Sequence, residues 1–114
     1  RKFLDEVTAM GLDLLITEFD VNDRLLPGDV NARDASVAAI SRDYLDVSLS
    51  YTRLRDFVLW GMADHANWLQ GLESQRADGL PMRPCPFDTQ LQAKPLRTAI
   101  ADALKAMPMR ASVS

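Results

Sequence analysis

Two short apolar segments, separated by a stretch with helical periodicity, constrain the fold of this chain more than any other feature. Residues 12–21 read LDLLITEFDV and are apolar on both faces, as in a parallel strand covered on both sides. Residues 57–61 read FVLWG, and their aromatic and β-branched side chains favour a second buried strand. Parallel strands need a crossover connection, which is right-handed in nearly all proteins. The sequence therefore predicts an α/β fold built on a parallel strand pair.

Helical periodicity lies on both sides of the first predicted strand. Apolar residues over 3–10 recur at helical spacing, and Gly11 stands where a residue in the left-handed conformation would end the helix. After the strand, residues 27–29 (PGD) indicate a turn, and Asn31 followed by Asp34 resembles a capping pair. A helix of about four turns should follow. Its expected buried stripe is Val37, Ile40, Tyr44, Val47 and Tyr51.

The second half of the chain contains a long loop and a last helix. Residues 64–92 include several glycines and prolines and show no sustained period, so we expect a loop, which at this length is often functional. Lys94 and Pro95 open the last helix, with proline in its first turn. Residues 109–114 are expected to be a frayed tail. The expected buried side of this helix is Leu96, Ala99, Ile100, Ala103, Leu104 and Met107.

Charge and cysteine content exclude several classes of protein. The net charge is −3, whereas a nucleic-acid binder needs a basic surface to displace counterions. No apolar run approaches the roughly 18 residues of a membrane span, and no signal-peptide pattern opens the chain. One cysteine permits no internal disulfide and no cysteine-based zinc site, and we expect no metal. The chain does not begin with Met, so we expect a processed, truncated or excised chain.

Two acidic residues end the first predicted strand. Glu18 and Asp20 are two positions apart, so alternation places both on one face, with Thr17 and Phe19 on the other. Two adjacent carboxylates are costly to bury because like charges raise each other's pKa. The pair is therefore either a catalytic feature or a strand end that emerges into solvent.

Further candidate residues follow the second predicted strand. Trp60 and Trp68 could form a stacking platform for sugar rings, or they could be core residues. Asp64 and His65 look like an acid-base pair, although an exposed loop pair is the commoner case. Cys85 stands between two prolines with no base nearby, so we expect a packed thiol.

Three segments together resemble a known family. Residues 16–20 (ITEFD) resemble the ITE(L/F)D signature of glycoside hydrolase family 10, the endo-1,4-β-xylanases. Residues 59–69 (LWGMADHANWL) resemble that family's WG-x-x-D-x-x-x-W stretch, and residues 86–95 resemble its FD-x-x-x-x-x-KP segment. The three motifs occur in the family's order across nearly the whole chain, which makes the resemblance much more specific than any one of them.

The resemblance implies a (β/α)₈ TIM barrel, with residues 1–114 as its C-terminal segment and the two predicted strands as strands seven and eight. Active-site groups then lie at the carboxyl ends of those strands. Glu18 matches the nucleophile of a retaining mechanism, and Asp20 matches an Asp that fixes a histidine bonded to the nucleophile. The substrate would be xylan or xylo-oligosaccharides, and no cofactor is required. Implied substrate-binding residues are Trp60 and Trp68, which would stack on xylose rings, with Asp64 and His65 in a supporting loop.

The chain also departs from the family pattern. A barrel needs about 250 residues and eight strands. Nothing here resembles the family's acid/base segment, WDVVNE, and the only histidine, His65, is not the one expected beside Asp20. His65 and Asn67 stand where many relatives have a basic residue and a Ser or Thr. We therefore expect a chain that carries the nucleophile but lacks the proton donor.

Several alternatives follow from the missing parts. Two strands leave open edges, so self-association or pairing with a complementing barrel fragment is expected. The chain could instead be a non-catalytic fragment that binds xylo-oligosaccharides or oligomerises, or a relic with no current role. By analogy with enzymes that attack polymeric xylan, the parent enzyme is expected to be secreted or periplasmic.

Overall fold

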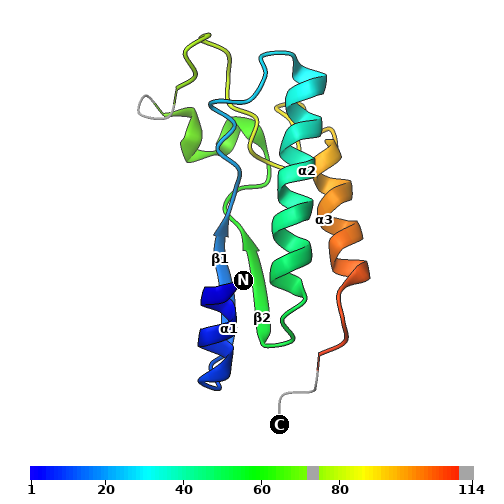
Figure 1. Cartoon of the computed structure of the whole chain (residues 1–114). Helices are drawn as coiled ribbons and strands as arrows, with labels where there is room; N and C mark the ends of the chain where they lie inside the picture. The colour runs from blue at the N-terminus through cyan, green and yellow to red at the C-terminus, as the bar shows by residue number, and fades with distance from the viewer. Residues whose placement is uncertain (72–74, 111–114) are drawn as a thin grey trace.

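The computed structural model describes residues 1–71 and 75–110, and its centre is a pair of parallel strands (Figure 1). β1 (Leu14–Phe19) pairs with β2 (Leu54–Leu59), and α2 (Val30–Leu49) connects them. α1 (Lys2–Ala9) precedes β1, and α3 (Pro95–Ala106) follows the long loop, which contains the short 3₁₀ turns η1 (Asp64–Ala66) and η2 (Trp68–Gln70). The predicted α/β order and the parallel pairing are confirmed.

α2 and α3 pack together over one face of the strand pair (Figure 1). The core lies between these helices and the strands, because Leu14, Ile16 and Phe57 contact the buried helix residues. The buried members of this core are Val37, Leu45, Leu49, Leu54, Leu96, Ile100 and Ala103. The opposite face of the strands is open, with Leu15 59% exposed. The expectation of strands covered on both sides is therefore wrong for this chain.

β1 departs from regular alternation near its carboxyl end. Ile16 pairs with Phe57 and Phe19 pairs with Leu59, so three steps along β1 match two along β2. This register shift, in which β1 has one extra residue, changes the side to which later residues point. Ile16 contacts the core, and the Phe19 ring lies 5.7 Å from the Tyr44 ring of α2, so Ile16, rather than Thr17, shares the helix-covered face with Phe19. Glu18 is exposed.

α2 begins earlier than its sequence suggests, and it buries a different face from the predicted one. Its N-cap is Asp29, whose Oδ2 accepts a hydrogen bond from the Ala32 amide at 2.8 Å, so the assignment of the cap to Asn31 is wrong. Tyr51 lies beyond the helix, and Ile40 and Tyr44 are about half exposed. The buried face instead contains Val37, Ser41, Leu45, Ser48 and Leu49.

Loss of the α2 cap should lower stability measurably. Replacing Asp29 by alanine leaves the Ala32 amide without its side-chain acceptor and should cost about 1 kcal/mol of unfolding free energy. The matched control is Asn31→Ala, one residue inside the helix, which should change stability little. Urea unfolding of both variants measures the difference, and equal losses would contradict the role of Asp29.

α3 begins where the sequence predicts, with Lys94 before it and proline in its first turn. Leu96, Ile100 and Ala103 are buried as expected, whereas Leu104 and Met107 are more than one-third exposed. The chain after α3 is held at residue 110, because the Arg110 guanidinium donates to the carbonyls of Leu49 at 2.7 Å and Tyr51 at 3.2 Å. The predicted frayed tail is therefore wrong at that residue, and residues 111–114 lie outside the described part.

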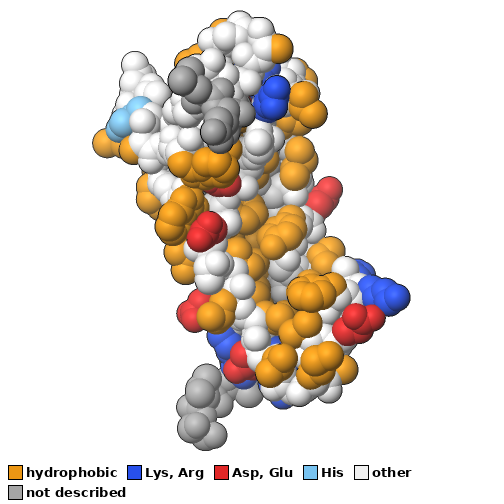
Figure 2. Space-filling view, turned by 90° about the vertical axis from the view of Figure 1, so that its left-hand side faces the viewer, with side chains coloured by type: hydrophobic (Ala, Val, Ile, Leu, Met, Phe, Trp, Pro, Cys, Tyr) orange, Lys and Arg blue, Asp and Glu red, His pale blue; other side chains and the backbone are white. Residues whose placement is uncertain are grey.

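Apolar side chains remain exposed on the face that carries β1 (Figure 2). A groove of about 360 Å³ runs between α1, β1 and α2. Its apolar lining is Phe3, Leu4, Leu14, Leu15, Ile16, Tyr44 and Leu54. Monomeric proteins rarely leave such a surface uncovered, so the face has the character of an interface.

Candidate active site

The carboxyl ends of β1 and β2 bring the candidate residues to one end of the sheet. Because the strands are parallel, residues that follow them emerge on the same side. Glu18 is the second-to-last residue of β1, and Trp60 directly follows β2. The Trp60 amide donates to the Phe19 carbonyl at 2.9 Å, which continues the ladder one residue beyond β2. The structure thus places Trp60 beside the strand end that carries Glu18 and Asp20.

Both tryptophans are surface residues in this chain. Trp60 is 48% exposed and Trp68 is 60% exposed, so the alternative of two core tryptophans is wrong. Trp68 lies in η2, and its indole Nε1 donates to Asp20 Oδ2 at 2.7 Å. The aromatic faces are therefore accessible, and one of the two rings is bonded to the end of β1.

The two carboxylates at the end of β1 have different surroundings. Glu18 is exposed, as the solvent-facing interpretation expects, whereas Asp20 is partly buried. Asp20 Oδ2 accepts from Trp68 and lies 3.5 Å from Asn67 Nδ2. Glu18 is thus available to a ligand, and Asp20 is engaged by the loop that carries Trp68.

Asp64 is a buried member of an ion pair and is not turned towards His65. Its side chain is 1% exposed, and both carboxylate oxygens lie about 3 Å from Lys94 Nζ, at 3.1 and 3.0 Å. Asp64 Oδ1 also accepts from the Cys85 amide at 2.9 Å. Burial raises the pKa of Asp64, although the bonds from Cys85 and Lys94 oppose that shift. His65 is exposed. The Asp64 carboxylate therefore stabilises the loop through Lys94 and Cys85 and does not form an acid-base pair with His65.

Cys85 is a packed thiol, as predicted. It is 1% exposed, and burial, followed by the nearby charge of Asp64, raises the pKa of the Cys85 thiol to about 11. Since the thiolate is the reactive form, such a thiol is inert.

Slow alkylation is the expected consequence. A rise of two pKa units from 9.0 lowers the thiolate fraction at pH 8 by about 100-fold, before any effect of access. Iodoacetamide should therefore modify the native chain at least about 100-fold more slowly than the chain unfolded in urea. Mass spectrometry of timed samples gives both rates, and comparable rates would contradict a buried, protonated thiol.

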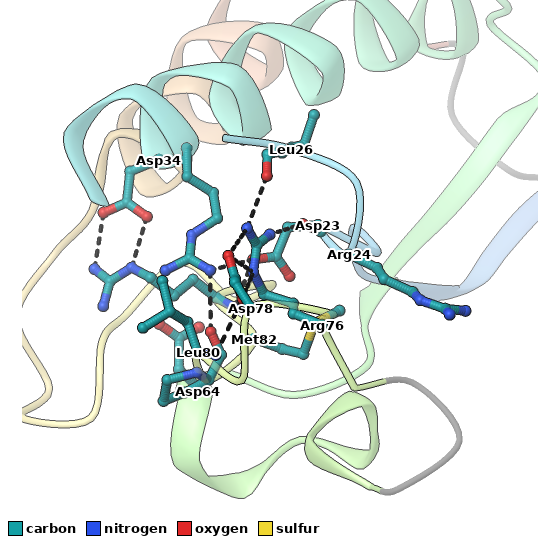
Figure 3. A network of polar contacts seen from close by, with 12 residues as sticks. Asp23, Arg24, Leu26, Asp34, Asp64, Arg76, Asp78, Leu80 and Met82 are labelled. Atoms are coloured by element: carbon teal, nitrogen blue, oxygen red, sulfur yellow. Dashed lines mark hydrogen bonds and ion pairs between the residues drawn. The ribbon is translucent and has the colours of Figure 1, made fainter. Parts of the chain in front are cut away.

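A network of charged side chains holds the long loop, and sequence analysis did not identify it (Figure 3). Arg76 pairs with Asp78 at 2.7 Å and donates to the carbonyls of Asp23 and Leu26, so it joins the loop to the segment between β1 and α2. Arg76 is 6% exposed and Asp23 is completely buried. Charged residues in a loop without periodicity carry no local signal of burial, so only the tertiary contacts identify them.

The same network fixes the loop to α2. Asp34 is not a capping residue; its carboxylate binds the Arg83 guanidinium through two hydrogen bonds of 2.8 Å (Figure 3). Arg33 Nη1 lies 3.6 Å from Asp23 Oδ2 and donates to the Pro81 carbonyl at 3.1 Å. Bidentate pairs of this kind fix geometry as well as charge. The loop that follows the tryptophans is therefore anchored to α2 over residues 81–83.

Two general properties of the described residues bear on function. Residues 1–71 and 75–110 contain no group of three or more His, Cys, Asp or Glu side chains placed to hold a metal ion. Over the same residues, no helix has the length and apolarity to cross a membrane.

Comparison of the sequence with models of protein families shows the family to which the chain belongs. A family model described as glycosyl hydrolase family 10 matches residues 1–103. The chain belongs to this family. The resemblance drawn from the ITEFD, WG and FD segments is therefore confirmed at the level of the family.

Relatives of known name agree with the family 10 assignment. The chain is 30% identical over 107 residues to an exoglucanase, XynX, of Acetivibrio thermocellus, an alignment that covers 92% of this chain and 9% of that protein. It is also similar to native xylanase 10B of Thermotoga maritima, with 25% identity and a TM-score of 0.74 over 90% of this chain and 30% of that structure. Xylanase 10B of Thermotoga petrophila, solved with xylobiose, gives 26% identity and a TM-score of 0.73 over 90% and 29%.

The family 10 chain thus spans less than one-third of the solved structures it matches. It folds as part of a TIM barrel, which explains the two-stranded sheet and the uncovered apolar face. The active-site end of such a barrel is the end where strand carboxyl termini emerge, and the candidate residues lie there.

Proposed function

We propose that this chain supplies the nucleophile and one wall of the active site of a retaining endo-1,4-β-xylanase. The observation that carries the proposal is the position of exposed Glu18 and Trp60 on adjacent strand ends, joined by the 2.9 Å bond from the Trp60 amide to Phe19. Family membership supports the hydrolase chemistry. The xylobiose complex of the Thermotoga petrophila relative supports xylo-oligosaccharides as the substrate class.

The chemistry assigns different roles to the carboxylates. Glu18 attacks the anomeric carbon of the bound xylose unit, and the glycosidic oxygen leaves as a second carboxylic acid protonates it. Water then hydrolyses the glycosyl-enzyme, so configuration is retained. Asp20 does not fit the role of that acid, since a retaining pair stands about 5–5.5 Å apart on opposite sides of the scissile bond, whereas Asp20 lies two residues after Glu18, at the same strand end, and binds Trp68. We infer that another part of the barrel supplies the acid, because no segment of this chain resembles the family's acid/base sequence.

The proposal assigns β1 and β2 to strands seven and eight of the barrel, with residues 1–114 as its C-terminal segment. The carboxyl-end location of Glu18 and the order of the three motifs support this assignment. His65 and Asp64 then belong to the loop at the sugar-binding wall. Asp64 would support this loop through its bond to Lys94. Since polymeric xylan does not enter cells, the parent enzyme would act in the periplasm or outside the cell.

The exposed apolar groove between α1, β1 and α2 favours a second candidate function. A chain with open sheet edges and this groove would associate with other copies, or with a complementing barrel fragment, and could bind xylo-oligosaccharides on Trp60 and Trp68 without cleaving them. In that case Glu18 would have no catalytic part.

One assay separates the two functions. The purified chain is incubated with xylan, alone and after assembly with a fragment that supplies the other six strands of a family 10 barrel. We expect reducing-sugar release only from the assembled mixture, because proton donation to the leaving group typically contributes about 10²- to 10⁴-fold. Assembly by gel filtration without any sugar release would contradict the catalytic proposal. Sugar release by the chain alone would show that a proton donor comes from within its own assembly.

A further inference from the structure

The contacts of Asp20 go beyond what the proposed mechanism needs. Trp68 is 60% exposed, so packing alone restrains its ring weakly. Its indole N–H nevertheless donates to Asp20 Oδ2 at 2.7 Å, a bond between the loop after β2 and the residue that follows β1. A hydrogen bond to a carboxylate is stronger than one to a neutral acceptor. Asp20 is therefore placed to fix the orientation of an otherwise exposed aromatic ring.

Asn67 makes a second set of contacts at the same place. Its Nδ2 donates to the Trp60 carbonyl at 2.9 Å, and its Oδ1 accepts from the Leu69 amide at 2.9 Å. One side chain thus joins the residue after β2 to the first turn of η2, which carries Trp68.

The backbone is shaped to permit this contact. Gly61 has φ +116°, and a Cβ there would lie 2.9 Å from Asn67 Nδ2. Only a glycine allows both that conformation and that approach. The close fit of Gly61 against Asn67 shows that the loop is folded around this amide.

We propose that Asp20 and Asn67 are positioning residues that hold Trp60 and Trp68 as one preformed sugar-binding wall. Asp20 holds the indole of Trp68, and Asn67 holds the Trp60 backbone against the turn that carries Trp68. The sugar as ligand rests on the proposed function, whereas the positioning of the rings does not. Because Asp20 is two residues from Glu18, the same contact links the nucleophile strand to the wall.

The expected effect of these contacts is that the tryptophan rings are already oriented before a sugar binds. Ordering one side chain on binding lowers affinity by about 2- to 10-fold, so a ring that is already oriented binds a sugar more tightly by about that factor. The effect should depend on the indole N–H, since that is the group that Asp20 holds.

The first test follows the indole protons of the full chain by ¹H–¹⁵N NMR. The chain has two tryptophans, so two indole signals are expected, and Trp60→Phe assigns them. In Asp20→Ala the Trp68 proton should exchange with water about 10-fold faster and its signal should move, with a smaller change in Asp20→Asn, which keeps an acceptor oxygen. Asp43→Asn, an exposed carboxylate on α2, is the matched control and should leave the signal in place. An unchanged Trp68 signal in Asp20→Ala would overturn the proposal.

The second test is a double-mutant cycle on binding of xylo-oligosaccharide to the chain, read by calorimetry. Asp20→Ala should weaken binding about 2- to 10-fold when Trp68 is present and should have no further effect in Trp68→Phe, which keeps an aromatic ring but has no N–H. An equal loss in both backgrounds would show that Asp20 acts by another route. If the indole signal responds as expected but no sugar binds, the positioning of the ring stands and the proposed function fails.

Discussion

Replacing Glu18 by alanine should abolish xylan hydrolysis by the assembled barrel, with a loss of roughly 10⁴-fold or more, because in the proposed mechanism this carboxylate forms the covalent bond to the sugar. Glu18 is exposed at the carboxyl end of β1, so removal of its side chain leaves no buried cavity and should not impair folding. Reducing-sugar release from xylan measures the loss, and sugar binding should be nearly unchanged. Glu6→Ala, an exposed glutamate on α1, is the matched control and should keep full activity.

Addition of an external nucleophile to Glu18→Ala tests whether the lost activity is that of the nucleophile. Azide is small enough to occupy the space left by the carboxylate in Glu18→Ala and can attack the anomeric carbon from the same side. Turnover should then return in part, with a glycosyl azide of inverted configuration as the product. Rescue would distinguish loss of the nucleophile from general damage to the site. Full activity of Glu18→Ala without azide would show that another group attacks the sugar.

The position of the candidate residues at one end of the sheet was predictable, because each of them follows an apolar segment typical of a strand. Glu18 follows an apolar strand, and Trp60 follows the next strand, so a parallel pair brings both to one end. The register shift between Ile16 and Phe19 was not predictable, since alternation alone places Thr17 with Phe19. The contact of Asp20 with Trp68 was also not predictable, because it joins residues 48 positions apart.

The fold was predictable in its order and less so in its packing. The strands, the three helices and the start of α3 follow from apolar patterns and from Pro95. The buried face of α2 does not, because Ser41 and Ser48 are buried while Ile40 is about half exposed. Both serine hydroxyls donate to carbonyls one turn earlier, at 2.7 and 2.8 Å, so they need no water. Hydropathy counts such residues as polar and therefore places the stripe on another face.

The ion pair of Asp64 and Lys94 should have the largest effect on stability. Its members are 1% and 5% exposed, and it joins η1 to the residue before α3. Lys94→Met keeps the length of the side chain but leaves the Asp64 carboxylate buried without its cation. Breaking a buried pair in this way typically costs about 3–5 kcal/mol of unfolding free energy. Urea unfolding at pH 7 measures the loss.

The cost should depend on pH in a defined direction. Burial already raises the pKa of Asp64 above its usual 3.8, and loss of Lys94 removes one of the bonds that oppose this shift. A raised folded-state pKa favours the folded state fully below the unfolded value and progressively less as pH rises above it. Lys94→Met should therefore be less destabilised at pH 4 than at pH 7. A loss that is the same at both pH values would contradict an unpaired carboxylate as its cause.

The control is a variant that lacks the charge of Asp64 as well as that of Lys94. In the double variant Asp64→Asn, Lys94→Met, the amide oxygen can still accept the Cys85 N–H that Asp64 Oδ1 accepts at 2.9 Å, but no charge is buried. We expect this variant to regain most of the stability that Lys94→Met loses and to lose the added pH dependence, because the penalty arises from one uncompensated charge. If the two substitutions were additive instead, Lys94 would stabilise the loop mainly through its 2.9 Å bond to the Arg83 carbonyl.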